Sequence, residues 1–375
     1  MCSIPNRTRR GDSGEIAGPR LIHEREETDI GSDLEHGERR RAARVEREGV
    51  NAVFRVSAPA AGVSPPSGRS TRSVVTCYSV LDKFLPKCGF LDLSEGIYKG
   101  DAGTPFGQAQ LNQHDYLLDQ VQCGPGSRVL DVGCGYGTVL ERVRERGARG
   151  VGITLSPVQT RRCREQGFDV RLINYKALGK EWDAAFDGVI ANGSMEHFVQ
   201  PMDAAQGRAD AIYRNFFETV HRVLDPRSPA RRFVSTTIHF VRRPDPKDLL
   251  SNPFSFRKGS DGFHYGLLAR SFGGWYAEPG QLQRCAEGLF RLAGEVDGTE
   301  DYRLTSEEWL ARVKRTLWSW KGLGIAMDCL PTLLRHPVQF PTMLICMLVG
   351  ESWNWQFRPP NPPTRLLRQT WECQG

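Results

Sequence analysis

A short apolar run followed by three alternating glycines, at residues 129–137, constrains the fold of this chain more than any other segment. The run Val-Leu-Asp-Val has the length and composition of a buried strand, and a helical pattern follows the glycines as far as Arg146. Glycines at such a junction let the backbone turn sharply and come close to a ligand at the carboxyl edge of a sheet. The segment therefore predicts a strand, a ligand-binding loop and a helix in direct succession.

The rest of the chain repeats this alternation of strand and helix. Further strands are expected at residues 150–155, 170–174, 186–192 and 232–240, and further helices at residues 157–166 and 209–224. Strands and helices that alternate in this order form a parallel sheet with helices on both faces. The sequence therefore predicts an α/β fold with a doubly wound sheet.

Composition divides the chain into three regions. Residues 1–70 are rich in Arg, Glu, Gly, Ser and Pro and are expected to form a disordered basic arm. Residues 71–126 are expected to form an N-terminal helical cap, and residues 127–375 to form the sheet domain. The arginines of the arm are compatible with RNA or an anionic membrane as a partner, although a solvated tail is the simpler interpretation.

Charge and cysteine content restrict the partners and the compartment. The formal net charge of +6 is mild, and we expect no nucleic-acid partner. Ten cysteines without a Cys-x-x-Cys pair or metal-ligand spacing predict free thiols in a reducing cytoplasm and no metal site. The chain begins without the apolar stretch of a secretory signal, so we expect a cytoplasmic protein whose contact with a membrane is at most peripheral. The sequence does not predict an oligomeric state.

Apolar and aromatic residues gather in the C-terminal third. Residues 322–350 are the most apolar stretch, but they contain charged residues and three prolines, which favours a helical cap or a cavity wall over a membrane span. Aromatic residues between 240 and 271 either line an acceptor pocket or pack in a surface excursion. Four tryptophans are expected to be core residues rather than an aromatic cage: Trp318, Trp320, Trp353 and Trp355.

Asp131 restricts the ligand of the glycine loop. The glycine spacing is Gly-x-Gly-x-Gly, which differs from the Gly-x-Gly-x-x-Gly of pyrophosphate-binding loops. A carboxylate at the end of the strand would repel a diphosphate, whereas it can pair with an ammonium group. The loop therefore predicts a cofactor that has a positive charge.

Together with Val-Gly-Ile-Thr-Leu-Ser-Pro-Val-Gln at 151–159 and Met-Glu-His at 195–197, the glycine loop resembles the cyclopropane fatty acid synthase family of class I S-adenosylmethionine-dependent methyltransferases. The resemblance extends from about residue 93 to residue 371. It implies a Rossmann-like doubly wound sheet with helical cap elements, S-adenosylmethionine as cofactor, and methyl transfer to a small-molecule or lipid acceptor. It also implies that an insertion at about residues 240–350 covers the substrate.

The resemblance implies which residues hold the cofactor. The methionine part would lie against Asp131 and the glycine loop, and the ribose and adenine near Thr154 and Gln159. Trp182 is a candidate to stack on the adenine, with a core or surface tryptophan as an equal alternative. Ser94 precedes the first predicted strand at a position from which the family reaches the same ligand. The full predicted set is Ser94, Asp131, Gly133, Cys134, Gly135, Gly137, Thr154, Leu155, Gln159 and Trp182.

The resemblance also implies a change in the catalytic residues. In cyclopropane-forming members, a bicarbonate ion held by Cys, Glu, His and Tyr removes a proton after methyl transfer to an alkene. Glu196 matches the glutamate, whereas Glu95, Thr236 and Leu310 stand where the family has cysteine, histidine and tyrosine. A carboxylate repels an anion and leucine offers no hydrogen bond, so we expect bicarbonate binding to be lost. The predicted reaction is methyl transfer to an amine or a hydroxyl.

Four residues are the catalytic candidates that follow from this change. His239 could take the place of the missing histidine by a small shift in register, although a hydrogen-bonded residue at the end of a strand is the simpler interpretation. The candidates are Glu196, His197, Glu95 and His239.

Other functions stay open at this stage. The chain could be a true cyclopropane-fatty-acyl-phospholipid synthase. A nucleic-acid methyltransferase is disfavoured, because Asn-Gly-Ser-Met at 192–195 replaces the Asn-Pro-Pro-Tyr type of sequence that base amino methylation uses. A binding protein that has kept the fold without the activity is disfavoured by the intact glycines of the loop.

Overall fold

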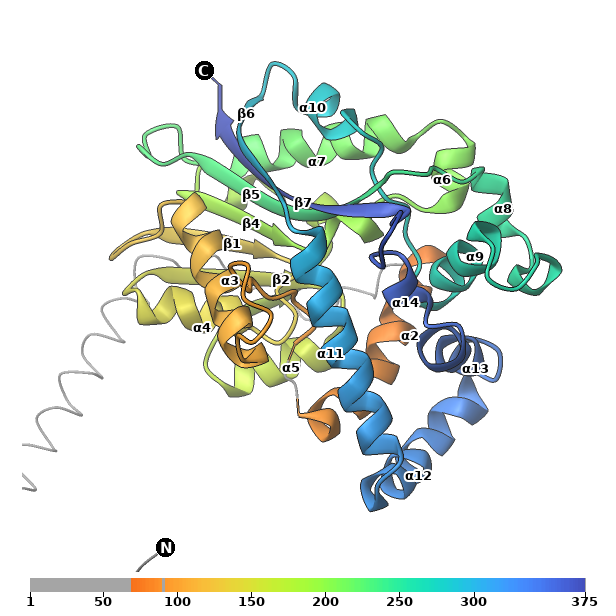
Figure 1. The fold of residues 1–375 in the computed structure, drawn as a ribbon. Helices are drawn as coiled ribbons and strands as arrows, with labels where there is room; N and C mark the ends of the chain where they lie inside the picture. The colour runs from red at the N-terminus through yellow and green to blue at the C-terminus, as the bar shows by residue number, and fades with distance from the viewer. Residues whose placement is uncertain (1–68, 90–91, 375) are drawn as a thin grey trace, which may run out of the picture. The chain divides into compact units, whose positions relative to one another are not determined.

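The computed structural model describes residues 69–89 and 92–374 (Figure 1). The chain divides into two units, Met1–Gly62 and Val63–Gly375, and all described residues belong to the second. The predicted N-terminal arm lies outside the described residues except for its last two positions, which begin the first described helix.

A seven-stranded sheet organises the second unit, with strand order β3-β2-β1-β4-β5-β7-β6 (Figure 1). The strands β1 to β5 are parallel, and β7 runs antiparallel to both β5 and β6. The predicted doubly wound α/β fold is confirmed, although β6 and β7 were not predicted. The strands are β1 Arg128–Val132, β2 Arg149–Thr154, β3 Asp169–Leu172, β4 Gly188–Asn192, β5 Arg232–Phe240, β6 Phe290–Asp297 and β7 Thr364–Cys373.

Helices cover both faces of the sheet and extend beyond its carboxyl edge (Figure 1). The α-helices are α2 Arg69–Phe84, α3 Phe106–Gln120, α4 Thr138–Glu145, α5 Pro157–Glu165, α6 Pro201–Ala205, α7 Ala209–Val223, α8 Pro246–Leu250, α9 Asp261–Phe272, α10 Gln281–Ala286, α11 Thr299–Leu317, α12 Trp320–Arg335, α13 Gln339–Leu344 and α14 Ser352–Trp355. Short 3-10 turns are η1 Leu85–Cys88, η2 Tyr175–Ala177, η3 Lys180–Trp182, η4 Met195–His197 and η5 Pro253–Ser255, and η6 Ile345–Val349 is a π-helical turn. None of the helices in the described ranges combines the length and the apolar content that crossing a bilayer requires.

The successive side chains of β1 point to opposite faces of the sheet, and both faces are covered, so the strand is buried on both sides. Leu130 belongs to the large core cluster that includes the aromatic residues of α7. Val129 packs instead with Leu117 of α3 and Val143 of α4. Helix α3, the second half of the predicted N-terminal cap, therefore forms one of the layers on the sheet.

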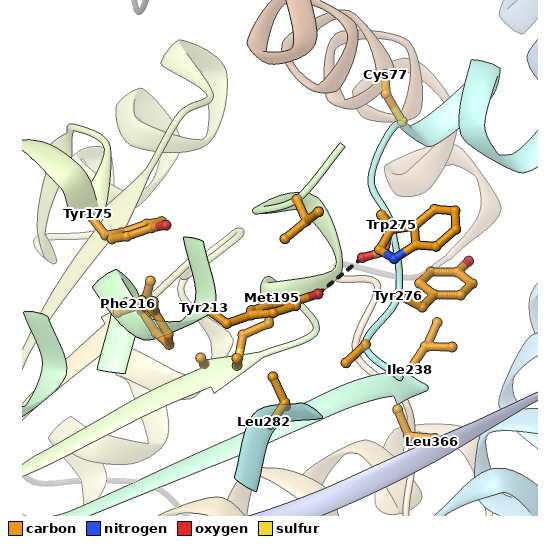
Figure 2. Close-up of a cluster of buried hydrophobic side chains, with 14 of the residues drawn as sticks. Cys77, Tyr175, Met195, Tyr213, Phe216, Ile238, Trp275, Tyr276, Leu282 and Leu366 are labelled. Carbon is orange, nitrogen blue, oxygen red and sulfur yellow. Dashed lines mark hydrogen bonds between the residues drawn. The ribbon is translucent and has the colours of Figure 1, made fainter. Parts of the chain in front are cut away.

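Aromatic residues of α7 form the centre of the large core cluster (Figure 2). Tyr213 and Phe216 are fully buried, and the Tyr213 hydroxyl donates a hydrogen bond to the backbone oxygen of Trp275 at 3.2 Å. Met195, the first residue of η4, is also fully buried in this cluster. The core thereby fixes the short turn in which Glu196 follows Met195.

Within the predicted insertion at 240–350, β6 joins the sheet. One expectation for the tryptophans of the C-terminal third was wrong. Trp353 and Trp355 are partly buried against the core, as predicted, but Trp318 and Trp320 are 90% and 93% exposed. These two side chains flank the junction of α11 and α12, where the chain turns and no other described element covers them.

Truncation of a core aromatic residue should show how strongly the α7 cluster stabilises the fold. Phe216 makes edge-to-face contacts with Tyr175 and Phe233. Phe216→Ala should lower the free energy of unfolding by about 3–5 kcal/mol, because it removes these contacts and leaves a cavity. Urea denaturation would measure the change in the free energy of unfolding. Phe254→Ala, at a residue that is 55% exposed, is the control and should change stability by less than about 1 kcal/mol; equal effects would contradict the assignment of the core.

Candidate active site

A cavity of about 570 Å³ opens at the carboxyl edge of β1, β2 and β4. The strand order reverses between β1 and β4, and a reversal of this kind leaves a crevice in which ligands of α/β proteins bind. Residues of α2, α11 and η6 close the cavity opposite the sheet. The structure thus brings the glycine loop and the end of β4 to one site.

The glycine loop bends over the end of β1 in a conformation that its glycines permit. Gly133 has φ +88°, and a Cβ there would come within 2.6 Å of the Ser194 Cβ. Gly135 has φ +53° and lines the cavity, and a Cβ there would meet no protein atom within 4 Å. The space in front of Gly135 is therefore left for a ligand. Cys134 and Leu155, both predicted to hold the cofactor, also line the cavity.

Gly137 has a different place from the one predicted. It does not line the cavity; it precedes α4 in a left-handed conformation, with φ +83°. A Cβ there would lie 3.0 Å from the Phe168 ring and 3.2 Å from the Cys163 sulfur. Gly137 is thus needed for the close packing of α4 rather than for contact with the cavity.

Asp131 ends β1 as a buried carboxylate, 1% exposed, beside the glycine loop. One of its oxygens, Oδ2, has no hydrogen-bond partner. Burial raises the pKa of Asp131 to about 7, and the nearby His114 opposes this rise. A carboxylate that lines a cavity without a hydrogen-bond partner can pair with a cation, because the cation stabilises the ionised form that burial disfavours.

Asp92 is a cavity residue that the sequence analysis missed. It accepts hydrogen bonds from the Ser94 hydroxyl at 2.7 Å and from Gln110 at 2.6 Å. Burial opposes its ionisation, but hydrogen bonding to His114 and the charge of that residue outweigh burial and lower the pKa of Asp92. Its position two residues before Ser94 was the available signal. Asp92 and Ser94 both line the cavity, so Asp92 holds the predicted Ser94 in place.

The residues predicted to surround the ribose and adenine are only partly brought together. Thr154 and Gln159 line the cavity, and the Thr154 hydroxyl donates to the Gln159 oxygen at 2.7 Å. Trp182 does not line it; its ring stacks on Phe186 with centroids 5.9 Å apart, within the core. Trp182 therefore packs in the core. Residues 173–176 line the neighbouring part of the cavity.

Glu196 lies just beyond the end of β4. Strand β4 pairs with β5 only as far as Thr236, so the amide of Ile238 has no strand partner on that side; it donates to Glu196 Oε1 at 2.9 Å. The other oxygen, Oε2, is buried without a partner. Burial raises the pKa of Glu196 to about 7, and the charge of Glu95 adds to the rise. A carboxylate of this kind is poised to accept a proton near neutral pH.

The two candidate histidines differ in position. His197 lines the cavity, its Nε2 lies 3.4 Å from the Tyr78 hydroxyl, and burial lowers its pKa to about 4, so the ring is neutral near pH 7. His239 does not line the cavity. It is an odd number of residues from Thr236, which does, and therefore points to the opposite face of β5. In the observed register of β5, His239 therefore does not reach the site.

Glu95 lines the cavity, but its charge is matched by an arginine that the sequence analysis did not identify. Arg368 of β7 is 2% exposed; its Nε lies 3.4 Å from Glu95 Oε1, and its Nη1 donates to Asp301 Oδ2 at 2.9 Å. Burial raises the pKa of Glu95, and Arg368 opposes that rise. The three residues form a charge cluster beside the cavity, in which Glu95 and Arg368 are buried and Asp301 is partly exposed.

The far wall of the cavity is mainly apolar. Helix α11 contributes Trp309, Leu310 and Val313, and η6 contributes Met347 and Leu348. The indole nitrogens of Trp309 and Trp353 are buried without a hydrogen-bond partner. This wall could hold a hydrocarbon and donate hydrogen bonds to a polar group on it. No group of three or more His, Cys, Asp or Glu in the described part of the chain could hold a metal ion.

Comparison with known proteins finds relatives of this chain. The family model described as mycolic acid cyclopropane synthetase matches residues 94–243. Cyclopropane mycolic acid synthase 1 of Mycobacterium tuberculosis is 30% identical over 232 residues, which cover 59% of this chain and 72% of the relative. Cyclopropane mycolic acid synthase 3 of the same organism is 27% identical over 210 residues, which cover 54% of this chain and 67% of the relative.

Solved structures share the fold. The cyclopropane synthase MmaA2 of Mycobacterium tuberculosis aligns with a TM-score of 0.62 at 18% identity, covering 84% of this chain and 100% of that one. The mycolic acid cyclopropane synthase CmaA1, complexed with SAH and CTAB, aligns with a TM-score of 0.60 at 21% identity, covering 83% of this chain and 99% of that one.

The sheet order, the glycine loop and the carboxylate at the end of β1 define a class I methyltransferase that uses S-adenosylmethionine as its cofactor. The chain belongs to the mycolic acid cyclopropane synthetase family. It is therefore an S-adenosylmethionine-dependent enzyme of the cyclopropane synthase family.

A methyl group at Gly135 should obstruct the cofactor, because the space in front of this residue belongs to the cavity. Gly135→Ala should weaken S-adenosylmethionine binding at least about tenfold, or about 1.4 kcal/mol. Gly126→Ala is the matched control: Gly126 has φ +82°, also faces open space, and does not line the cavity. Isothermal titration calorimetry would compare the two. Equal affinities in the two variants would show that the cofactor does not approach Gly135.

Proposed function

We propose that this enzyme transfers the methyl group of S-adenosylmethionine to a nitrogen or oxygen atom of an apolar acceptor, with Glu196 as the base that takes the acceptor's proton. The observation that carries the proposal is Glu196 Oε2, which is buried, unpartnered and part of a carboxylate with a pKa of about 7 in the cavity wall. When bound, the cofactor supplies a methyl carbon on a sulfonium that a nucleophile can displace. The acceptor atom gains the C–N or C–O bond, the C–S bond breaks, and the acceptor's proton goes to Glu196.

The cofactor end of the cavity fits S-adenosylmethionine by its chemistry. The unpartnered oxygen of Asp131 suits the ammonium of the methionine part, and Gly133 and Gly135 allow the backbone to approach it. Asp92 positions Ser94 for contact with the same part. We assign the ribose and adenine to the stretch of wall that contains Thr154, Leu155 and Gln159.

Three features of the catalytic end favour proton transfer to Glu196 over a bicarbonate-dependent reaction. Thr236 is already engaged, since its hydroxyl donates to Asn192 at 2.6 Å and accepts from the Gly193 amide at 3.0 Å. Leu310 offers no hydrogen bond. Glu95 lines the cavity where the family has cysteine and would repel an anion, and the single charge of Arg368 is shared between Glu95 and Asp301. We infer that bicarbonate does not bind here.

We assign the remaining catalytic candidates to positioning roles rather than to proton transfer. His197 is neutral near pH 7, and we assign it the role of orienting the acceptor. Glu95 is assigned to the charge cluster with Arg368 rather than to proton transfer. The apolar wall of α11 and η6 suits a hydrocarbon chain, in keeping with relatives whose names refer to mycolic and fatty acids. We therefore propose a lipid-like acceptor that has one nucleophilic polar group.

Replacing Glu196 should remove the pH dependence along with the activity. Below pH 7 the carboxylate is protonated and cannot act as a base, so kcat at saturating cofactor should fall about tenfold per pH unit as pH drops below 7. Glu196→Gln should lower kcat by about 100-fold to 10,000-fold at pH 8, with cofactor affinity nearly unchanged. Glu141→Gln, at an exposed carboxylate on α4, is the control. If the Glu196→Gln variant retained the rate and the wild-type pH profile, Glu196 would be excluded as the base.

Bicarbonate should have no influence on the reaction. Assays in buffer depleted of carbon dioxide, with and without added bicarbonate, should give equal initial rates of methyl transfer from labelled cofactor to lipid extracts. The product should be an N-methyl or O-methyl compound, identified by NMR. A cyclopropane ring in the product and a rate that requires bicarbonate would instead make the enzyme a true cyclopropane synthase.

A further inference from the structure

Helix α12 exposes an apolar surface that the active site does not use. We define the α12 face by seven exposed side chains on and beside this helix: Trp318, Trp320, Leu323, Met327, Leu330, Leu334 and Val338. Figure 1 shows α12 at the end of α11 that lies farthest from the sheet. A contiguous apolar face of this kind marks an interaction surface, because isolated exposed apolar residues do not follow one side of a helix.

The spacing of the exposed residues gives α12 two apolar sides. Gly322, Ile325 and Cys329 are buried and face the elements against which α12 packs, namely α2, α11 and α13. Positions 320, 323, 327, 330 and 334 recur at three-residue and four-residue intervals and form a second stripe on the outer side. Folding of the chain explains the inner stripe. It does not explain the outer one.

Basic residues accompany the outer stripe. Between positions 315 and 338, Arg315, Lys321 and Arg335 are exposed, and the single acidic residue, Asp328, pairs with Lys87. The surface therefore combines apolar side chains with net positive charge. That combination complements an anionic lipid headgroup layer above an acyl layer.

We propose that the α12 face docks on the surface of a bilayer that contains anionic lipid, with α12 lying in the plane of the interface. The two indoles support a lipid partner, since tryptophan prefers the headgroup level, where its ring is buried and its N–H stays solvated. The inner side of α12 is packed against the protein, so only the outer stripe can enter the interface. A second copy of the chain is disfavoured, because a symmetric contact would bring Lys321 and Arg335 against a surface of the same charge.

This inference goes beyond the proposed reaction and does not depend on which atom accepts the methyl group. It concerns where the enzyme works. Helix α11, against which α12 packs, also supplies Trp309, Leu310 and Val313 to the apolar wall of the cavity. Docking would therefore hold the acceptor wall close to a lipid phase.

Vesicle binding by the full-length chain tests the proposal. The wild-type protein should sediment with vesicles of phosphatidylglycerol and phosphatidylcholine at low salt, and about tenfold more weakly with phosphatidylcholine alone. Trp318→Ser with Trp320→Ser should weaken binding to the anionic vesicles about tenfold or more, and Lys321→Glu with Arg335→Glu should have a similar effect. Phe254→Ser, at an exposed aromatic residue outside the α12 face, is the control and should bind like the wild type.

Two further measurements keep the result interpretable. Unfolding midpoints and S-adenosylhomocysteine affinity should match the wild type in every variant, so that loss of vesicle binding is not loss of fold and stays separate from failure of the proposed reaction. Analytical ultracentrifugation would reveal a dimer. The proposal is overturned if the wild type ignores anionic vesicles, if the tryptophan variant binds them equally well, or if the same variant abolishes a dimer instead.

Discussion

The ion pairs of the buried Arg368 guanidinium are the interaction on which the arrangement around the end of the cavity at Glu95 depends. The guanidinium contacts Glu95, which precedes α3, and Asp301, which lies in the first turn of α11, while Arg368 itself comes from β7. An uncompensated buried charge costs several kcal/mol, so these three parts of the chain have one favourable arrangement. Helix α11 is thereby held over the end of the sheet, and the positions of Tyr302 and Leu310 in the cavity wall follow from that placement.

Two buried carboxylates in one cavity differ in what surrounds them. Asp131 and Glu196 both lie at the ends of parallel strands, both are buried, and both have a pKa raised to about 7 and one oxygen without a partner. Asp131 lies beside the glycine loop, so a cationic ligand can restore its charge. Glu196 is held by the Ile238 amide on one side only, which leaves its second oxygen for a proton. In the proposed function, similar chemistry serves binding at one end of the site and reaction at the other.

Local patterns predicted the parallel half of the fold, whereas tertiary contacts decided the rest. Strands β1 to β5 follow from apolar runs between glycines and helices, and Asp131 and Glu196 from their places at strand ends. Gly137 and Trp182 match family positions, but neighbours such as Phe168 and Phe186 determine that they pack rather than line the cavity. Arg368 lacked any local signal, because its partners lie 273 and 67 residues away. The exposure of Trp318 and Trp320 likewise depends on what surrounds the end of α11.

The position of β7 in the sheet sets the order in which the protein can assemble. Strand β6 pairs only with β7 among the described strands, and β7 inserts between β6 and β5. During synthesis, β6 therefore leaves the ribosome about seventy residues before the strand that gives it a place. The same strand contains Arg368, so Glu95 and Asp301 lack this partner until β7 has been made. A nascent chain halted before β7 would have the glycine loop and its parallel strands, yet it would lack the charge cluster beside the cavity.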